Sequence, residues 1–152
     1  SGVTRMAEIF NELEAEPEDQ LKLINKRDAY MFNSWYANVA KLKHGERTDN
    51  YLYMHPDDAE IRQIRDGALV RIENQYGHVE TGVKLTHDLK PGVVAMPHGW
   101  GQGTTAGMQD AQANPGTNCN AVLPSGPDSF DPLSNQSHMT GISVDVRLAV
   151  ER

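Results

Sequence analysis

The sequence is poor in cysteine and in long apolar runs. A single cysteine, Cys119, excludes a disulfide within the chain and leaves no Cys-x-x-Cys pair for zinc or an iron–sulfur cluster. No apolar run approaches the ~20 residues that a membrane helix needs, and no signal peptide is visible. We therefore expect a cytoplasmic location without membrane insertion. The Ser-Gly start without a methionine predicts a piece of a longer polypeptide.

Basic residues are also scarce. Lys and Arg number 14 against 21 Asp and Glu, which gives a net charge of −7 and a pI of about 5.3. A nucleic-acid surface needs clustered Lys and Arg, so the composition argues against nucleic acid as a partner. Part of the acidic excess lies in residues 8–19, which we interpret as the solvated face of a helix and a connector.

The N-terminal segment is predicted to be helical. Apolar residues recur at helical spacing within residues 3–16, and Pro17 stops the pattern. We expect this helix and a connector to occupy residues 1–19, followed by a single domain over residues 20–152, which is long enough for its own core. The apolar helix positions are Met6, Ile9, Phe10 and Leu13.

The rest of the chain consists mainly of short strand patterns. One short helix is expected from Pro56, because proline suits the first helical position and Asp57 and Asp58 suit the positive end of the helix dipole. A second short helix, over residues 35–42, belongs to one of two interpretations of the polar segment after the first strand. About six strands with few helices predict a mainly β domain, either a closed barrel or a sandwich. The predicted strands span residues 20–25, 51–54, 68–74, 79–85, 93–96 and 142–150. In the first strand Leu21 and Leu23 are expected to point inward, and in the last strand Ile142, Val144, Val146 and Leu148 share one face.

Two polar loops are the candidate binding regions. Residues 26–38 follow the first predicted strand and combine Arg, Asn, Ser and Trp; a surface turn that leads to a short helix explains this composition equally well. Residues 97–120 are rich in glycine and proline and hold Trp100 between two glycines. A long loop of this kind inside a compact domain is usually functional or disordered, and its Trp, Met, Asn and Cys favour function.

No catalytic motif accompanies these loops. The six histidines lack the spacing of metal ligands, although His98 lies within the glycine-rich loop. Gly99, Gly101 and Gly103 resemble a fragment of a phosphate loop, but the helix and acidic residue of a dinucleotide fold do not follow them. Cys119 has no identifiable base partner, so we expect an inert thiol. The residues therefore predict binding rather than bond-breaking chemistry.

Six short motifs occur in one order along the chain. They are Lys26-Arg27-Asp28 with Asn33-Ser34-Trp35 and Asn38; His55-Pro56-Asp57-Asp58-Ala59; Asp66-Gly67-Ala68-Leu69-Val70; Pro91 to Gly101; Asn114 to Asn120; and Asp131-Pro132-Leu133-Ser134. Through them the chain resembles the C-terminal molybdopterin-dinucleotide-binding domain of the dimethyl-sulfoxide-reductase family of molybdenum or tungsten oxidoreductases. The Asn-Ser-Trp and Pro-His-Gly-Trp-Gly motifs are most similar to formate-dehydrogenase and assimilatory-nitrate-reductase-like members.

The resemblance implies a six-stranded double-psi β-barrel with short peripheral helices that holds molybdopterin guanine dinucleotide. Its partners would be the remaining domains of a parent oxidoreductase, with an iron–sulfur or other electron-transfer subunit as a further candidate. In this family the metal ligand lies in other domains, so the chain would have no catalytic residue and would be inactive alone. The implied cofactor-binding residues are Arg27, Asn33, Ser34, Trp35, His98, Gly99, Trp100, Asn118 and Asn120.

Two alternatives stay open at this point. One is a free-standing barrel subunit that assembles with a separate catalytic chain, and the other is a double-psi barrel used only for protein interaction. The sequence also departs from the family near Gln63, where a glycine usually ends the helix; left-handed backbone is less favourable for glutamine, so the helix end is expected to differ locally. A second departure is Val122-Leu123-Pro124, which leaves the path of that loop open.

Overall fold

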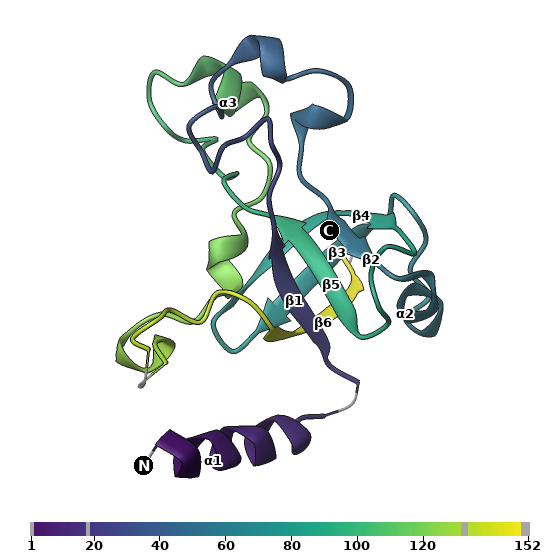
Figure 1. Cartoon of the computed structure of the whole chain (residues 1–152). Helices are drawn as coiled ribbons and strands as arrows, with labels where there is room; N and C mark the ends of the chain where they lie inside the picture. Colours follow the sequence, from purple (N-terminus) through teal and green to yellow (C-terminus); the bar gives the residue numbers. More distant parts are fainter. Residues whose placement is uncertain (1, 18, 132–133, 150–152) are drawn as a thin grey trace.

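Six strands close into a barrel. The computed structural model of the chain describes residues 2–17, 19–131 and 134–149. The strands follow one another around the barrel in the order β1-β5-β2-β4-β3-β6 (Figure 1). This confirms the predicted mainly β barrel, and each strand overlaps its predicted range. The strands are β1 (Leu21–Lys26), β2 (Leu52–Met54), β3 (Leu69–Asn74), β4 (Gly77–Leu85), β5 (Val93–Pro97) and β6 (Ile142–Leu148).

Two strand pairs are parallel, β1 with β5 and β2 with β4, while the other four pairings are antiparallel. Exchanging β1, β2 and β3 with β4, β5 and β6 leaves this order and these directions unchanged, which is the internal pseudo-twofold symmetry of a double-psi barrel. Parallel strands finish at the same edge of a sheet, so β1 and β5 end side by side, with Lys26 paired to Pro97. The two predicted binding loops follow these two strands and therefore meet.

Alternate strand residues fill the barrel. Successive side chains of a strand point to opposite faces, so Leu21 and Leu23 of β1 both point inward and are 1% exposed. Val144 and Val146 of β6 are buried in the same way, as predicted. Leu148, which was predicted on that face, is 46% exposed at the end of its strand. Val150, the last residue of the predicted strand, lies outside the described residues.

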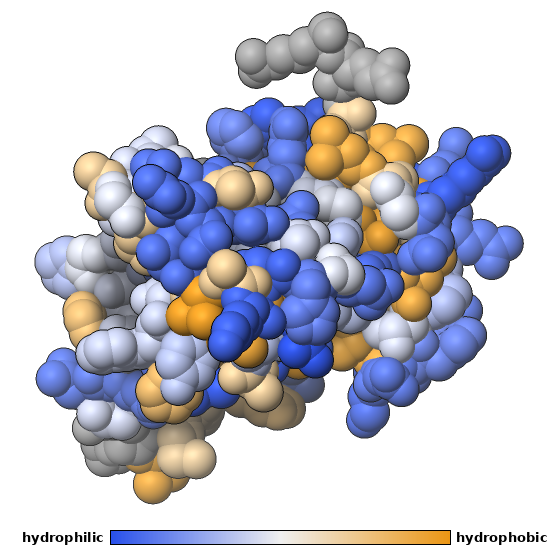
Figure 2. Space-filling view, turned by 90° about the horizontal axis from the view of Figure 1, so that it is seen from above, coloured by the Kyte–Doolittle hydropathy of each residue, from blue (hydrophilic) through white to orange (hydrophobic). Residues whose placement is uncertain are grey.

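A lobe rises beyond the ends of β1 and β5 (Figure 1). It is built from residues 27–50 and 98–118, and it has a small apolar core separate from that of the barrel. Viewed from this end, the surface is mostly hydrophilic with small apolar patches between polar side chains (Figure 2). The lobe core contains Met31, Ala37, Trp100 and Ala111. Its short helices are η1 (Ala40–Leu42), η2 (Gly45–Thr48) and α3 (Gln109–Ala113).

The helix over residues 35–42, one of the two alternatives for this segment, does not form as such, because only Ala40–Leu42 is helical, as a single 3₁₀ turn. The side chain of Asn38 instead caps a distant helix. Its Oδ1 accepts hydrogen bonds from the backbone N–H groups of Asp110, at 2.9 Å, and Ala111, at 3.2 Å. These N–H groups belong to the first turn of α3, a helix that the sequence did not predict. Asn38 thus joins the two segments of the lobe.

The remaining helices lie outside the barrel. α1 (Gly2–Glu14) is separated from the barrel and lies at the end opposite the lobe (Figure 1). α2 (Pro56–Ile61) starts at the predicted proline, and Gln63 just after it has a φ of 56°, so a glutamine adopts the left-handed geometry that glycine favours. Among the described residues, no helix is long and apolar enough to cross a membrane. Two further 3₁₀ turns are η3 (Cys119–Val122) and η4 (Pro127–Ser129).

Candidate functional site

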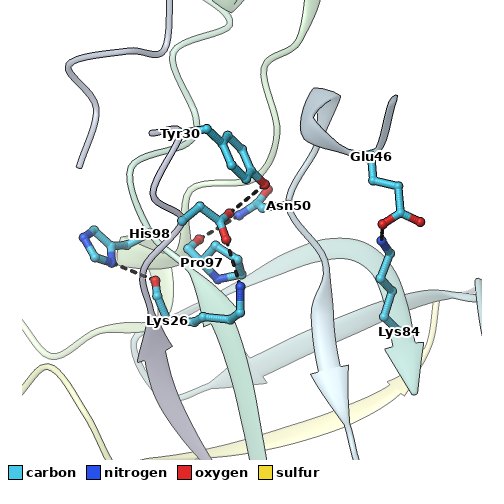
Figure 3. Close-up of polar contacts among 8 residues, drawn as sticks. Lys26, Tyr30, Glu46, Asn50, Lys84, Pro97 and His98 are labelled. Atoms are coloured by element: carbon cyan, nitrogen blue, oxygen red, sulfur yellow. Dashed lines mark hydrogen bonds and ion pairs between the residues drawn. The ribbon is translucent and has the colours of Figure 1, made fainter. Parts of the chain in front are cut away.

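His98 joins the two loops at the strand ends. It is the first residue after β5, and its backbone N–H donates to the carbonyl oxygen of Lys26, at the end of β1, at 3.2 Å. Its ring Nδ1 lies 3.1 Å from the same oxygen, and its Nε2 lies 2.9 Å from Oδ1 of Asn33. Figure 3 shows the ring of His98 beside the Lys26 carbonyl. The histidine therefore holds the loop after β1 against the loop after β5.

Gly99 allows these two loops to touch. Its φ is +93°, and a Cβ at this position would lie 1.6 Å from the carbonyl oxygen of Asn33. Gly101 has a φ of +103°, and a Cβ there would lie 2.5 Å from Cβ of Asn118. Only glycine combines this backbone geometry with such close contacts. The glycine-rich loop thus packs against both the first binding loop and the segment that carries Asn118.

Asn50 fixes the third segment of the site. Its buried side chain donates to the carbonyl oxygen of Pro97 at the end of β5 and exchanges two hydrogen bonds with the backbone of Thr117. Figure 3 shows the Asn50 amide beside Pro97. The carbonyl of Asn50 also accepts a hydrogen bond from the hydroxyl of Thr81, at 2.7 Å. Asn50 is not among the predicted site residues, and its position just before the buried strand β2 is only a weak signal for such a role.

These segments enclose a cleft of about 560 Å³. All of the predicted site residues except Trp35 line it. Asn25 also lines the cleft, and it could have been found because it ends the first predicted strand, directly before the polar loop of residues 26–38. Met139 had no signal in the sequence. The full lining is Asn25, Arg27, Asn33, Ser34, His98, Gly99, Trp100, Gly101, Gln102, Asn118, Asn120 and Met139.

Arg27 and Asn120 present free donors to the cleft. In the part of the chain that the structure describes, no carboxylate pairs with the Arg27 guanidinium, and the side-chain nitrogen of Asn120 donates to no protein acceptor. Asn118 is held in place instead, since its Oδ1 accepts the backbone N–H of Asn120 at 3.1 Å, at the start of η3. A guanidinium suits phosphate oxygens, and an amide offers both a donor and an acceptor to a heterocycle.

The two tryptophans occupy different environments. Trp100 is 3% exposed and forms a wall of the cleft. Behind it, Nζ of Lys43 lies 4.1 Å from the ring centroid, and burial lowers the pKa of this ammonium below its ordinary value. The indole Nε1 of Trp100 is buried, and it has no hydrogen-bond partner among the described residues. Trp35 is 78% exposed and does not line the cleft, so its predicted cofactor contact stays a prediction.

Cys119 precedes the cleft residue Asn120 but does not itself line the cleft. Cys119 is 2% exposed, and burial raises the pKa of its thiol above the ordinary value, in keeping with the inert thiol expected from the sequence. Among the described residues, no group of three or more His, Cys, Asp or Glu side chains is placed to hold a metal ion. What the cleft offers is one guanidinium, several amides and closely approachable backbone. These groups suit an organic anion with a hydrogen-bonding ring.

Comparison with known proteins gives the family. The model of the molydopterin dinucleotide binding domain family matches residues 21–141, which is most of the chain. The chain belongs to this family. Its ligand is therefore a molybdopterin dinucleotide, and relatives from the dimethyl sulfoxide reductase family support molybdopterin guanine dinucleotide as the cofactor. This molybdopterin-binding domain has the double-psi barrel that the resemblance implied.

Relatives with different substrates carry a similar segment. Dimethyl sulfoxide reductase DmsA of Haemophilus influenzae is 42% identical over 67 residues, which make up 44% of this chain and 8% of that protein. The alpha subunit of an F420-dependent formate dehydrogenase of Methanocaldococcus jannaschii is 35% identical over 52 residues, 34% of this chain and 8% of that protein. The segments that match this chain thus make up less than a tenth of these relatives.

A solved structure shares the fold. Acetylene hydratase from Pelobacter acetylenicus superposes with a TM-score of 0.70 at 20% identity, covering 85% of this chain and 18% of that chain.

The side chains of the cleft also fit this cofactor, independently of the comparisons. Among the described residues, Arg27 has no carboxylate partner and the side-chain nitrogen of Asn120 donates to no protein acceptor, so the two groups are available to a phosphate and to a ring edge.

Proposed function

We propose that this domain holds molybdopterin guanine dinucleotide in its strand-end cleft as one part of a larger molybdenum or tungsten oxidoreductase. The observation that carries the proposal is the convergence of three sequence segments, which begin near Arg27, His98 and Asn118, on one cleft beside the parallel ends of β1 and β5. The two curated relatives described above are more than ten times longer than the segments they share with this chain, which supports a parent enzyme with further domains.

Each group of the cleft has a distinct task in this proposal. Arg27 pairs with the pyrophosphate, because its guanidinium has two parallel donors and no carboxylate partner among the described residues. Asn120 donates to and accepts from the edge of the pterin. Ser34 and the backbone at Gly99 add hydrogen bonds at close range. His98 acts through Asn33 by holding the two loops at a fixed separation.

The chain's contribution is to position the cofactor, while the bound cofactor supplies oxidation–reduction chemistry at its metal. Trp100, buried between the cleft and the lobe core, excludes water from one side of the site. The remaining domains of the parent would supply the metal ligand and the substrate pocket. We propose that an iron–sulfur or other electron-transfer subunit exchanges electrons with the parent enzyme. We also propose that the enzyme is located in the cytoplasm.

The test uses the parent enzyme with Arg27→Ala and Asn120→Ala. After purification, molybdenum or tungsten per polypeptide is measured by mass spectrometry and the pterin by the fluorescence of its oxidised form. A hydrogen bond to a charged group contributes roughly 1.5–3 kcal/mol and a neutral one roughly 0.5–1.5 kcal/mol, so Arg27→Ala should weaken cofactor binding about 10- to 100-fold and Asn120→Ala about 2- to 10-fold. Arg65→Ala and Asn11→Ala are matched controls at exposed positions outside the cleft.

Full loading and activity in both cleft variants would overturn the cofactor site. It would favour the alternative of an interaction module, for which these substitutions are neutral. The other alternative, a free-standing barrel subunit, is decided by the mass of the native polypeptide that carries this segment. A band near 16.8 kDa on an immunoblot would indicate a separate subunit, and a band several times heavier would indicate a domain of a larger enzyme.

A further inference from the structure

The residues at the end of β1 face two different pockets. Asn25 and Arg27 line the cofactor cleft, whereas Lys26 and Asp28 line a second pocket of about 360 Å³. Asn25 and Lys26 are neighbours in β1, and successive side chains of a strand point to opposite faces. The two pockets share no lining residue. We call the second one the outer pocket, and its lining is Lys26, Asp28, Tyr30, His44, Gly45, Glu46, Arg47, Tyr53 and Lys84.

Three strands and one 3₁₀ turn build the outer pocket. Lys26 belongs to β1, Tyr53 to β2 and Lys84 to β4, and Tyr53 is the ladder partner of Lys84. Residues 44–47, at the start of η2, line the pocket from the side of the lobe. Figure 3 shows the Glu46 carboxylate, from η2, meeting the ammonium of Lys84, from the barrel. The outer pocket thus lies where the barrel meets the lobe.

The outer pocket is basic within an acidic chain. Its cationic side chains are Lys26, Arg47 and Lys84, and its carboxylates are Asp28 and Glu46, whereas the whole chain carries a net charge of −7. Each cation lies on a tyrosine ring, with its charged group 4.9, 5.1 and 4.2 Å, respectively, from the ring centroid. A cation–π contact holds a cation in place without neutralising its charge. The outer pocket therefore attracts anions.

One of the two carboxylates is held firmly by the protein. The side chain of Asp28 is 5% exposed, and it accepts hydrogen bonds from Nζ of Lys26, at 2.8 Å, and from the hydroxyl of Tyr30, at 3.0 Å. Burial raises the pKa of Tyr30 above its ordinary value, so this hydroxyl keeps its proton and can donate to Asp28. The charges of Lys26 and Asp28 are thus matched within the protein, and a ligand has no need to separate them.

The other carboxylate is easily displaced. Glu46 lies 2.9 Å from Nζ of Lys84, but its side chain is 84% exposed, and an exposed ion pair contributes little free energy. Arg47, the next residue, has no carboxylate partner among the described residues. When Glu46 turns into water, two unpaired cations, Arg47 and Lys84, face the outer pocket. The Glu46 carboxylate therefore marks the place where the oxygens of an incoming anion would bind.

We propose that the outer pocket binds a small phosphate monoester, with its phosphoryl group held by Arg47 and Lys84 in place of the Glu46 carboxylate. A phosphate monoester carries nearly two negative charges at pH 7, which match the two cations, and a guanidinium binds two phosphate oxygens in parallel. The volume suits a small organic molecule. Among the described residues, the ring of His44 and the hydroxyl of Tyr53 have no hydrogen-bond partner, so they suit the hydroxyl groups of a sugar or polyol. This inference goes beyond the proposed function and does not depend on it.

The experiment titrates the 152-residue chain, which contains the whole closed barrel, with glucose 6-phosphate at constant ionic strength. Backbone amide shifts are followed by NMR, and we expect saturable shifts at residues 45–47 and 84. Arg47→Ala and Lys84→Ala should each weaken binding at least about ten-fold. Arg65→Ala, at an exposed position outside the pocket, is the matched control and should leave binding unchanged. Arg47 is itself exposed, so its loss should leave the Tm unchanged.

Glu46→Gln gives a readout that a purely structural role would not move. The substitution removes the competing carboxylate, so glucose 6-phosphate should bind up to about five-fold more tightly. Weaker binding in this variant overturns the proposal. Shifts of equal size with sodium chloride would mean charge screening only and also overturn it, as would shifts that Arg27→Ala abolishes, which would place the anion in the cofactor cleft. Inorganic phosphate should bind at the same residues but more weakly, and equal or tighter binding overturns the monoester in favour of free phosphate.

Discussion

The side-chain amide of Asn50 forms a closed pair of hydrogen bonds with the backbone of Thr117: Nδ2 donates to the Thr117 carbonyl at 2.9 Å, and Oδ1 accepts the Thr117 N–H at 2.7 Å. The same Nδ2 donates to the Pro97 carbonyl at 3.0 Å. Asn50 is 1% exposed, so these groups have little access to water as a substitute partner. One buried side chain therefore sets the distance between the end of β5 and the segment of Asn118 and Asn120.

Asn50→Ala should destabilise the domain and disturb the cleft together. The substitution leaves the backbone groups of Pro97 and Thr117 without these partners, and unsatisfied buried groups cost about 1–3 kcal/mol each. We expect the free energy of unfolding to fall by about 2–4 kcal/mol in a urea titration. Asn50→Asp should do the same, because a carboxylate cannot donate to the two carbonyls. The exposed Asn11→Ala serves as control, and an unchanged midpoint in Asn50→Ala would contradict the role.

Gly99→Ala should separate the two binding loops. A Cβ at Gly99 would lie 1.6 Å from the Asn33 carbonyl, so the loops must move apart. Gly107 provides the control, because its φ of +80° is similar but a Cβ there would meet nothing within 4 Å. Gly107→Ala should lower the free energy of unfolding by about 1–2 kcal/mol through backbone strain alone. Gly99→Ala should lower it by more than that. Equal losses in thermal unfolding would mean that the contact with Asn33 is unimportant.

Gln63→Gly should stabilise the domain. Gln63 holds a φ of 56° just after α2, a geometry that glycine adopts without a Cβ penalty. Part of the gain is offset by the greater freedom of glycine in the unfolded chain, so the expected increase in unfolding free energy is about 0.5–1 kcal/mol. Gln63→Ala removes the side chain but keeps the Cβ, and it should show no gain. A loss of stability in Gln63→Gly would refute the explanation.

The Cys119 thiol should react slowly in the folded domain. Burial raises its pKa above the unfolded value, so the folded state retains the thiol proton at pH values where the unfolded state has lost it. The resulting contribution to stability is complete below the unfolded pKa and is lost as pH rises through the folded pKa. At pH 8 a thiol-specific colorimetric reagent should modify Cys119 much more slowly in buffer than in 6 M guanidinium. Equal rates would show that the thiol is accessible.

Several features were predictable because they depend on local geometry. Side chains alternate along a strand, so the inward faces of β1 and β6 followed from the spacing of Leu21, Leu23, Val144 and Val146. Pro56 and the acids after it defined the start of α2. The loop after β5 was marked by its glycines, and the order of motifs along the chain indicated the family before any contact was known.

Other features required contacts between distant segments, which leave little local signal. The choice between a helix and a binding loop after β1 stayed open in the sequence, and in the structure Asn38 of this segment caps α3, 70 or more positions further on. Asn50 and Met139 became part of the site only through tertiary packing. Trp35 lies in a loop whose composition predicts binding. The strained turn beside it nevertheless directs its side chain away from the cleft.

The sequence by itself determined the inward residues of β1 and most of those of β6, where the two polar loops lie and which family the motifs resemble. Only the tertiary structure decided that β1 and β5 run side by side in parallel, so that Arg27 and His98 meet at one end of the barrel. The physical reason is the range of the forces involved. Backbone and side-chain geometry fix the direction of a residue within its own element, whereas strand pairing in a closed barrel depends on which of several apolar strands can share one core and satisfy one another's hydrogen bonds.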